Sequence, residues 1–215
     1  MKIVLFGATG HVGQRIVREA LERGHEVVGV VRDPAKSQAP DPRVRLVRGD
    51  ATDAASVARA VRGADAVVSA VSPRPGSTGS APSLVAAARG LIAGLREAEV
   101  KRLVVVGGAG SLEVAPGVAL MDAPGFPDEY RAEATEGRDS LAVYRAEAEG
   151  LDWTFLSPAI VIQPGERTGT YRTTVDQLLT DEQGNSAISY EDYAVALVDE
   201  LEKPQHVGRR FGVAY

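Results

Sequence analysis

The sequence predicts an α/β fold, a doubly wound parallel sheet in a single domain of 215 residues. Three observations support this prediction. Short apolar segments rich in Val, Ile and Leu alternate with longer helical patterns, these segments are nearly continuously apolar, and a glycine-rich turn joins the first of them to the first helix. Parallel strands buried on both faces have this pattern, and the ligands of such sheets bind beyond the carboxyl ends of the strands, where the strand order reverses.

Most of the chain divides into strand and helix patterns. Strands are expected at residues 2–6, 26–31, 44–49, 65–71, 102–107 and 153–157, with a final strand at 209–215. The first helix carries Val12, Ile16 and Ala20 on one stripe and ends at Gly24, which fits the position after a helix end. Further helices are expected at 53–62, 82–97, 127–149 and 188–202, and residues 159–215 are expected to contribute a small substrate-side lobe.

Composition and charge exclude several classes of protein. The formal net charge of −5 and the pI near 5.3 argue against a nucleic-acid-binding surface. The chain has no cysteine, which excludes disulfides and thiolate catalysis, and its three histidines lack the spacing of a metal site. No run of about 18 apolar residues could cross a membrane. We therefore expect a cytoplasmic protein, monomeric or homodimeric, that binds a small molecule and has no metal site and no nucleic-acid or membrane partner.

The glycine-rich turn predicts a dinucleotide site. In "KIVLFGATGHVG", Gly7 allows a sharp turn out of the strand, Gly10 allows backbone amides to approach a pyrophosphate, and Gly13 allows the helix to pack closely. The spacing is G-x-x-G-x-x-G and differs from the G-x-G-x-x-G fingerprint, but the turn directly follows a strand and opens a helix, as the mechanism requires. The alternative is a tight turn without a ligand.

Four motifs give the chain a resemblance to a known family. The segments "GATGHVG", "VVRDPAK", "GDATD" and "SYEDYAVALVDELE" resemble the atypical short-chain dehydrogenases of the NAD(P)H-binding, NmrA-like group. The resemblance implies an NAD(P)-binding Rossmann fold. The group includes NADPH-dependent flavin, biliverdin and quinone reductases, and also redox-sensing members that bind the cofactor without turnover.

The same resemblance implies a set of cofactor-binding positions. Asp50 and Ala51 would flank the adenine, the segment 69–71 would line the ribose, and the segment 157–160 would pass the nicotinamide, although each of these could be an ordinary strand end. Apart from the residues that select between NADP and NAD, the full set is Gly7, Thr9, Gly10, His11, Val12, Gly13, Asp50, Ala51, Ser69, Ala70, Val71, Gly107, Pro158, Ala159 and Ile160.

The end of the second strand predicts the cofactor preference. An acid at this position binds the ribose 2′-hydroxyl of NAD, whereas an arginine binds the 2′-phosphate of NADP. Both residue types occur here, but Asp33 precedes Pro34 and is explained as a helix cap. Arg32 is therefore assigned to the phosphate, with Lys36 adding to it, and NADPH is expected to bind more tightly than NADH. The alternative for Arg32 is a solvated surface side chain.

The catalytic pattern differs from that of the best-known members of the superfamily. Those enzymes use a tyrosine with a lysine four residues later, but Tyr130 is followed by Ala134 and Tyr144 by Ala148. A flavin or quinone can accept hydride and take its proton from water, so such acceptors are favoured. The candidate catalytic residues are Ser111, which could instead bond its own backbone, and Tyr130, which could instead pack on its helix turn. A non-catalytic, NAD(P)-binding redox sensor remains the alternative function.

Two loops are expected near the ligand crevice. The Pro-, Gly- and Ser-rich loop at 72–83 would either cover the crevice as a flap or be an ordinary solvated loop. The loop at 163–174 would lie beside the crevice, where its charged and aromatic side chains could bind substrate or pair with one another. These side chains are Glu166, Arg167, Tyr171 and Arg172.

Overall fold

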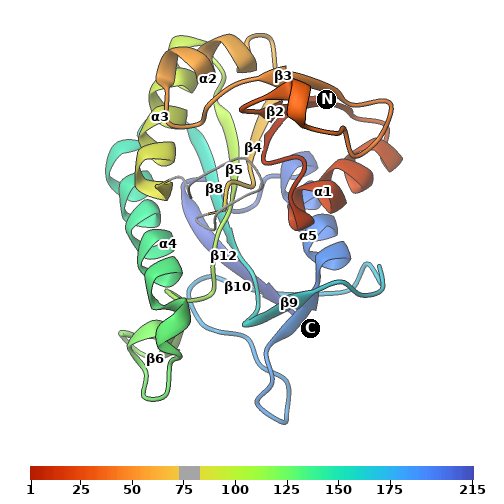
Figure 1. Ribbon diagram of the computed structural model, residues 1–215. Coiled ribbons are helices and arrows are strands. Elements are labelled where there is room, and N and C mark those ends of the chain that lie inside the picture. The colour runs from red at the N-terminus through yellow and green to blue at the C-terminus, as the bar shows by residue number, and fades with distance from the viewer. Residues whose placement is uncertain (73–82) are drawn as a thin grey trace.

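A computed structural model describes residues 1–72 and 83–215 (Figure 1). Within these residues the main sheet has eight strands in the order β10-β12-β8-β5-β4-β1-β2-β3, and neighbouring strands are parallel except for the pair of β10 with β12. The strands are β1 (Lys2–Phe6), β2 (Glu26–Val31), β3 (Arg45–Arg48), β4 (Ala66–Ser69), β5 (Arg102–Val106), β8 (Asp152–Ser157), β10 (Arg172–Thr174) and β12 (Arg209–Ala214). From β1, the sheet continues through β2 to β3 on one side and through β4, β5, β8 and β12 on the other. The strand order therefore reverses between β1 and β4.

Helices cover both faces of this sheet, as Figure 1 shows. They are α1 (His11–Glu22), α2 (Ala54–Val61), α3 (Leu84–Glu97), α4 (Asp128–Glu147) and α5 (Tyr190–Glu202), with short 3-10 turns at Pro34–Lys36 and Leu120–Asp122. One apolar cluster joins the sheet to α1 and α5, and a second joins it to α2, α3 and α4. Helices on both faces of a largely parallel sheet make the fold a doubly wound α/β fold, which confirms the predicted class.

The end of α1 and the start of α5 are fixed by local residues, close to the positions that the sequence predicts. Gly24 has a φ of 80° after α1, and the amides of Gly24 and His25 donate to the carbonyls of Leu21 and Ala20 at 3.1 and 2.9 Å. These two bonds form a Schellman motif, which satisfies carbonyls that the helix end would leave free. Ser189 caps α5 by accepting from the amide of Asp192 at 2.9 Å.

The short strands were not expected from the sequence. Besides β10, they are β6 (Glu113–Ala115) paired with β7 (Val118–Ala119), and β9 (Val161–Gln163) paired with β11 (Ala187–Ser189). Each has two or three residues, which is too short for a hydrophobic period to be recognised. Within residues 159–215, β12 joins the main sheet and α5 packs against α1, whereas β9 and β11 form a separate two-stranded sheet.

Candidate functional site

Two glycines bring the amino end of α1 close to the first turn. Gly7 has a φ of 83°, and a Cβ added to it would lie 2.4 Å from the carbonyl oxygen of Ala70, just after β4. A Cβ on Gly13 would lie 2.0 Å from the carbonyl oxygen of Gly7. Because backbone atoms cannot move aside as side chains do, both positions require glycine. The turn therefore sits between β1 and β4, where the strand order reverses.

The amino end of α1 has no side-chain cap. The N-cap residue is Gly10, the first turn contains no acidic residue, and Thr9, Gly10 and His11 are exposed, whereas Val12 is half-buried. By contrast, α2, α3 and α5 are capped by Asp53, Ser83 and Ser189, and α4, which also lacks a side-chain cap, has two acidic residues in its first turn. The first amides of a helix have no intrahelical acceptor and carry the positive end of the helix dipole. This open amide end fits an anionic group such as a diphosphate.

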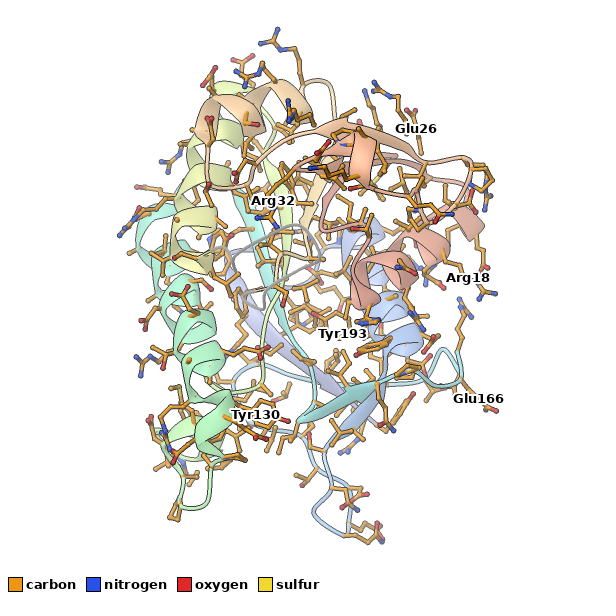
Figure 2. The ribbon with its side chains drawn as sticks, in the orientation of Figure 1. Arg18, Glu26, Arg32, Tyr130, Glu166 and Tyr193 are labelled. Atoms are coloured by element: carbon orange, nitrogen blue, oxygen red, sulfur yellow. The ribbon has the colours of Figure 1, made fainter. Side chains whose placement is uncertain are left out.

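Basic side chains gather where β2 and β3 end. Arg32 is exposed, and Figure 2 shows it at this edge. Asp33 accepts a hydrogen bond from the amide of Ala35 at 3.2 Å, so it caps the 3-10 turn as predicted, and Lys36 Nζ lies 3.6 Å from its carboxylate. Arg48 was not singled out in the sequence. Its Nε donates to the Arg32 carbonyl at 3.1 Å, and the parallel register that pairs it with Val31 brings it there.

The loops that follow β3 and β4 lie at the same carboxyl edge of the sheet as Arg32. The carboxylate of Asp50 accepts from the amide and hydroxyl of Thr52 at 2.9 and 2.8 Å, so it organises its own loop. Ala51 and Ser69 are buried, with exposed fractions of 7% and 4%, while Val71 is half-buried. The amide of Ala70 donates to the Phe6 carbonyl at 2.8 Å, which ties the end of β4 to the glycine turn.

A phenylalanine ring explains the glycine after β5. A Cβ on Gly107 would lie 2.1 Å from the Phe155 ring, so no serine side chain fits at this position. After β8, Pro158 and Ala159 are buried, whereas Ile160 is 50% exposed. At the end of β8, the Ser157 hydroxyl is buried and has no hydrogen-bond partner within the described residues.

The two candidate catalytic residues have different surroundings. The Ser111 hydroxyl accepts from Nη1 of Arg210 at 2.9 Å, and its carbonyl accepts from the same nitrogen at 2.7 Å. Among the described residues the serine thus bonds a buried arginine of β12 and not its own backbone, and a hydroxyl that accepts a hydrogen bond can still donate one. Tyr130 lies at the lower end of α4 in Figure 2 and is 48% exposed.

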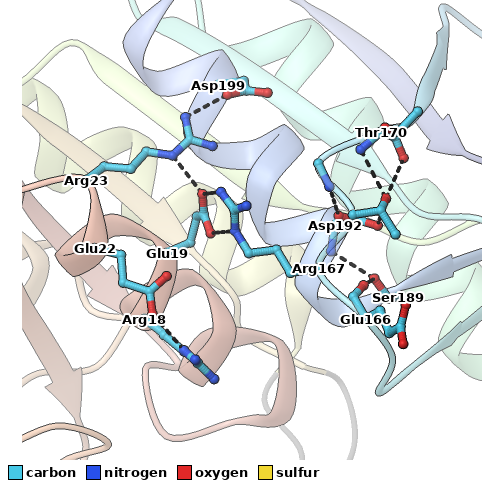
Figure 3. Close-up of polar contacts among 12 residues, drawn as sticks. Arg18, Glu19, Glu22, Arg23, Glu166, Arg167, Thr170, Ser189, Asp192 and Asp199 are labelled. Carbon is cyan, nitrogen blue, oxygen red and sulfur yellow. Dashed lines mark hydrogen bonds and ion pairs between the residues drawn. The ribbon is translucent and has the colours of Figure 1, made fainter.

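The loop at 163–174 is bonded to α1 and α5, and the hydrogen bonds found for three of its side chains go to distant residues and not to one another. Arg167 makes two hydrogen bonds to the Glu19 carboxylate at 2.6 and 2.7 Å (Figure 3), Tyr171 donates to Asp199, and Arg172 donates to the Tyr215 carbonyl. Glu166 lies at the right-hand edge of Figure 2, well away from Arg32. Only the tertiary fold supplies these distant partners. The predicted flap falls at 73–82, outside the described residues.

Two searches of the described residues gave negative results. No group of three or more histidine, aspartate or glutamate side chains is arranged to hold a metal ion. No helix combines the length and the apolar composition needed to cross a bilayer.

Comparison with known proteins identifies relatives along nearly the whole chain. A family model described as NAD(P)H-binding matches residues 7–204. The uncharacterized protein YwnB of Bacillus subtilis (strain 168) is 42% identical over 216 residues, covering 99% of this chain and 98% of that protein.

Two solved structures are similar across the whole chain. A Burkholderia pseudomallei protein provisionally designated as exported is 48% identical with a TM-score of 0.90, and the match covers 100% of both chains. A Streptococcus pneumoniae TIGR4 protein provisionally assigned as an NADH-flavin reductase is 35% identical with a TM-score of 0.83, covering 100% of this chain and 99% of that one. With the family match and the doubly wound fold, these similarities lead to one conclusion: the chain belongs to the NAD(P)H-binding family of Rossmann-fold proteins, and it resembles the atypical short-chain dehydrogenases.

Proposed function

We propose that this protein is an NADPH-dependent reductase that transfers hydride directly to small flat acceptors of the flavin or quinone type. The observation that carries the proposal is the uncapped, exposed amino end of α1, which lies behind the glycine turn at the reversal of strand order. Family membership and the NADH-flavin reductase relative support it. When bound, NADPH would supply the hydride.

The chain's own residues fit the proposed cofactor. The amides after Gly10 would bind the diphosphate, because they lack intrahelical acceptors and lie at the positive end of the helix. Arg32 would bind the 2′-phosphate, with Lys36 and Arg48 beside it, whereas Asp33 is already engaged as a cap. The other proposed cofactor contacts are those of the strand ends: Asp50, Ala51, Ser69, Ala70, Val71, Gly107, Pro158, Ala159 and Ile160.

Apolar side chains support a flat, apolar acceptor. Tyr130 in the helix after β5 is 48% exposed, and Ile160 and Val161 directly after β8 are 50% and 46% exposed. A planar ring that packs on any of these exposed side chains would cover apolar surface, which favours its binding. The Ser111 hydroxyl would donate a hydrogen bond to the acceptor, and Tyr130 would contact its ring.

This arrangement needs no strong protein acid. Within the described residues, Tyr144 is 2% exposed, and burial raises its pKa, so it is unsuited to proton transfer. A flavin or quinone takes hydride at an electron-poor atom and can take its proton from water. The protein would then act mainly by holding two rings in contact, since positioning alone contributes several kcal/mol.

A turnover assay tests the enzymatic role. NADPH oxidation is followed with riboflavin, FMN, a benzoquinone and an aldehyde as acceptors, with a no-enzyme control for each. We expect oxidation above the control rate with a flavin or quinone, and a low rate with the aldehyde. If NADPH binds tightly but no acceptor is reduced, the protein is instead a non-catalytic NAD(P)-binding sensor.

Calorimetric titration with NADPH and NADH tests the cofactor preference. We expect tighter binding of NADPH by about ten- to a hundred-fold, because a charge-assisted contact contributes roughly 1.5 to 3 kcal/mol. Arg32→Ala should remove most of this difference and leave NADH binding nearly unchanged. Equal affinities in the unmodified protein would refute the role of Arg32.

The cellular location and the oligomeric state of the protein are predictions. We expect a cytoplasmic protein that is monomeric or homodimeric, although the Burkholderia relative is provisionally designated as exported. Cell fractionation and sedimentation of the purified protein would test both expectations.

A further inference from the structure

A cavity of about 600 Å³ lies beside α4, away from the glycine turn. It is open to solvent and is lined by the middle of α4, by residues of the segment from Ser111 to Ala119, and by Asp176 and Arg210. Its volume lies in the range of small-molecule sites. Of the described residues that line it, none belongs to the proposed cofactor set, and Ser111 is shared with the proposed acceptor site.

The lining of this cavity is positive although the protein is acidic. Three arginines, Arg138, Arg145 and Arg210, face two carboxylates, Glu113 and Asp176. The formal charge of the lining is therefore +1, from three positive and two negative groups, on a chain of net charge −5. A concave positive surface on a negative molecule concentrates anions.

Buried polar contacts fix one wall of the cavity. Arg210 is 4% exposed, donates to the Ser111 carbonyl at 2.7 Å, and donates from Nε to the Asp176 carboxylate at 3.0 Å. Arg145 lies 3.3 Å from the same carboxylate oxygen. Arg210 is thus buried and occupied as a positioning group, whereas the arginines of α4, although also ion-paired, are about half exposed.

The two accessible arginines stand on one face of α4. The side chains of Arg138 and Arg145 are 46% and 53% exposed, and each has a carboxylate partner, Asp139 at 3.0 Å for Arg138 and Asp176 at 3.3 Å for Arg145, with which a bound anion would compete. They are seven residues apart, about two helical turns, so they project from the same side. Leu141, Ala142 and Ala146 line the cavity near them and provide apolar surface.

We propose that this cavity binds a small organic anion, in which an apolar body packs on α4 and a carboxylate or phosphate is held by Arg138 and Arg145. The guanidinium groups match both head groups because they donate two parallel hydrogen bonds. The proposal does not depend on the reductase function, since the site and its charges are separate from the glycine turn.

Calorimetry with 2-naphthoate, 2-naphthyl phosphate and neutral 2-naphthamide tests this site. We expect the two anions to bind at least about tenfold more tightly than the amide, and the comparison between them identifies the preferred head group. Backbone amide shifts in the intact protein should change at 138–146 and not at 7–13. Equal binding of the amide, or shifts centred on 7–13, would overturn the proposal.

Substitutions of exposed residues on α4 test anion binding without disturbing the core. Arg138→Ala and Arg145→Ala should each weaken anion binding by about tenfold, and Ala142→Glu should abolish it by placing a negative charge in the cavity. Arg89→Ala is the matched control, because Arg89 is 60% exposed, pairs with Glu147 and does not line the cavity. Anion affinities that are unchanged in the two α4 arginine variants, or no anion binding at all, would refute the proposal.

Discussion

Gly13 sets how closely α1 approaches the turn after β1. Since a Cβ here would lie 2.0 Å from the Gly7 carbonyl oxygen, Gly13→Ala must displace backbone. We expect the free energy of unfolding to fall by about 1 to 3 kcal/mol, as for other overpacked sites, and NADPH affinity to fall with it. Urea unfolding and calorimetry measure the two effects.

Gly137→Ala is the control for this substitution. Gly137 lies inside α4, and among the described residues a Cβ there would meet nothing within 4 Å. Alanine is the better helix former by about 1 kcal/mol, so this variant should be slightly more stable than the unmodified protein. Equal stability of the Gly13 and Gly137 variants would show that the close approach at α1 is unimportant.

Arg48 is the second basic side chain expected to affect cofactor choice. Its Nε is bonded to the Arg32 carbonyl at 3.1 Å, which holds its guanidinium at the edge where the 2′-phosphate is proposed to bind. Arg48→Ala should reduce the NADPH to NADH affinity ratio by roughly threefold to tenfold, with little change for NADH.

Arg45→Ala provides a comparison with the same loss of charge on the same strand. Arg45 is exposed and pairs with Val28, at the end of β3 away from the proposed site. Its affinity ratio should equal that of the unmodified protein. A similar loss in both variants would mean that Arg48 acts only through overall charge.

At the scale of elements, the segment 165–171 is held against α1 and α5 by carboxylates of both helices. The Gly165 amide donates to Glu191 at 2.8 Å, the Gly169 amide donates to Asp192 at 2.7 Å, and Arg167 pairs with Glu19 (Figure 3). Glu19 is 3% exposed and also binds Arg23 at 2.7 Å. These contacts join a loop without regular structure to two helices.

The contact between Arg167 and Glu19 should make the free energy of unfolding depend on pH. Hydrogen bonds from Arg167 lower the pKa of the Glu19 carboxyl; burial opposes the shift, and Arg23 adds to it. Because the folded pKa is lowered, the stabilisation is complete above the unfolded value of about 4.3 and is lost as the pH falls through the folded pKa. Arg167→Ala should therefore lose about 1 kcal/mol at pH 6 and progressively less toward pH 3.

Chemical denaturation at several pH values measures this difference. Arg18→Ala is the control, since Arg18 and Glu22 form an exposed pair on the same helix, with 78% and 46% of their side chains exposed. That variant should match the unmodified protein at every pH, because an exposed pair contributes little to stability. A pH-independent loss for Arg167→Ala would contradict an origin in the Glu19 charge.

For the whole molecule, the proposed dinucleotide site joins parts that are far apart in sequence. It draws on the turn after β1 and on the ends of β2, β3, β4, β5 and β8, which all meet at one edge of the sheet. A ligand that binds only the folded chain stabilises it by about 2.7 kcal/mol at a hundred times its Kd. NADPH at that excess should raise the Tm by roughly 5 to 10 °C, since 1 kcal/mol corresponds to about 2 to 4 °C at this size.

Differential scanning calorimetry with NADPH and NADH at one concentration checks this expectation. NADH should raise the Tm by less than NADPH, in proportion to its weaker binding. No shift with either nucleotide would contradict a dinucleotide site at this edge.

The sequence by itself determined the fold class, the positions of the long strands and helices, and the glycine turn. These features depend on local patterns: apolar periodicity, a glycine in the left-handed conformation after α1, and side-chain caps such as Ser189 and Asp33. Trp153 opens the strand expected at 153–157 and is 5% exposed. Such signals lie within a few neighbouring residues, so they can be recognised without knowledge of the fold.

Only the tertiary structure decided which distant groups meet. Arg210 holds Ser111 across 99 residues, Arg167 reaches Glu19 across 148 residues, and Phe155 occupies the space beside Gly107. A long polar side chain can pair with many partners, and no local pattern selects one of them. The crossover connections of the sheet make that selection, because they fix which strand ends and helix faces become neighbours.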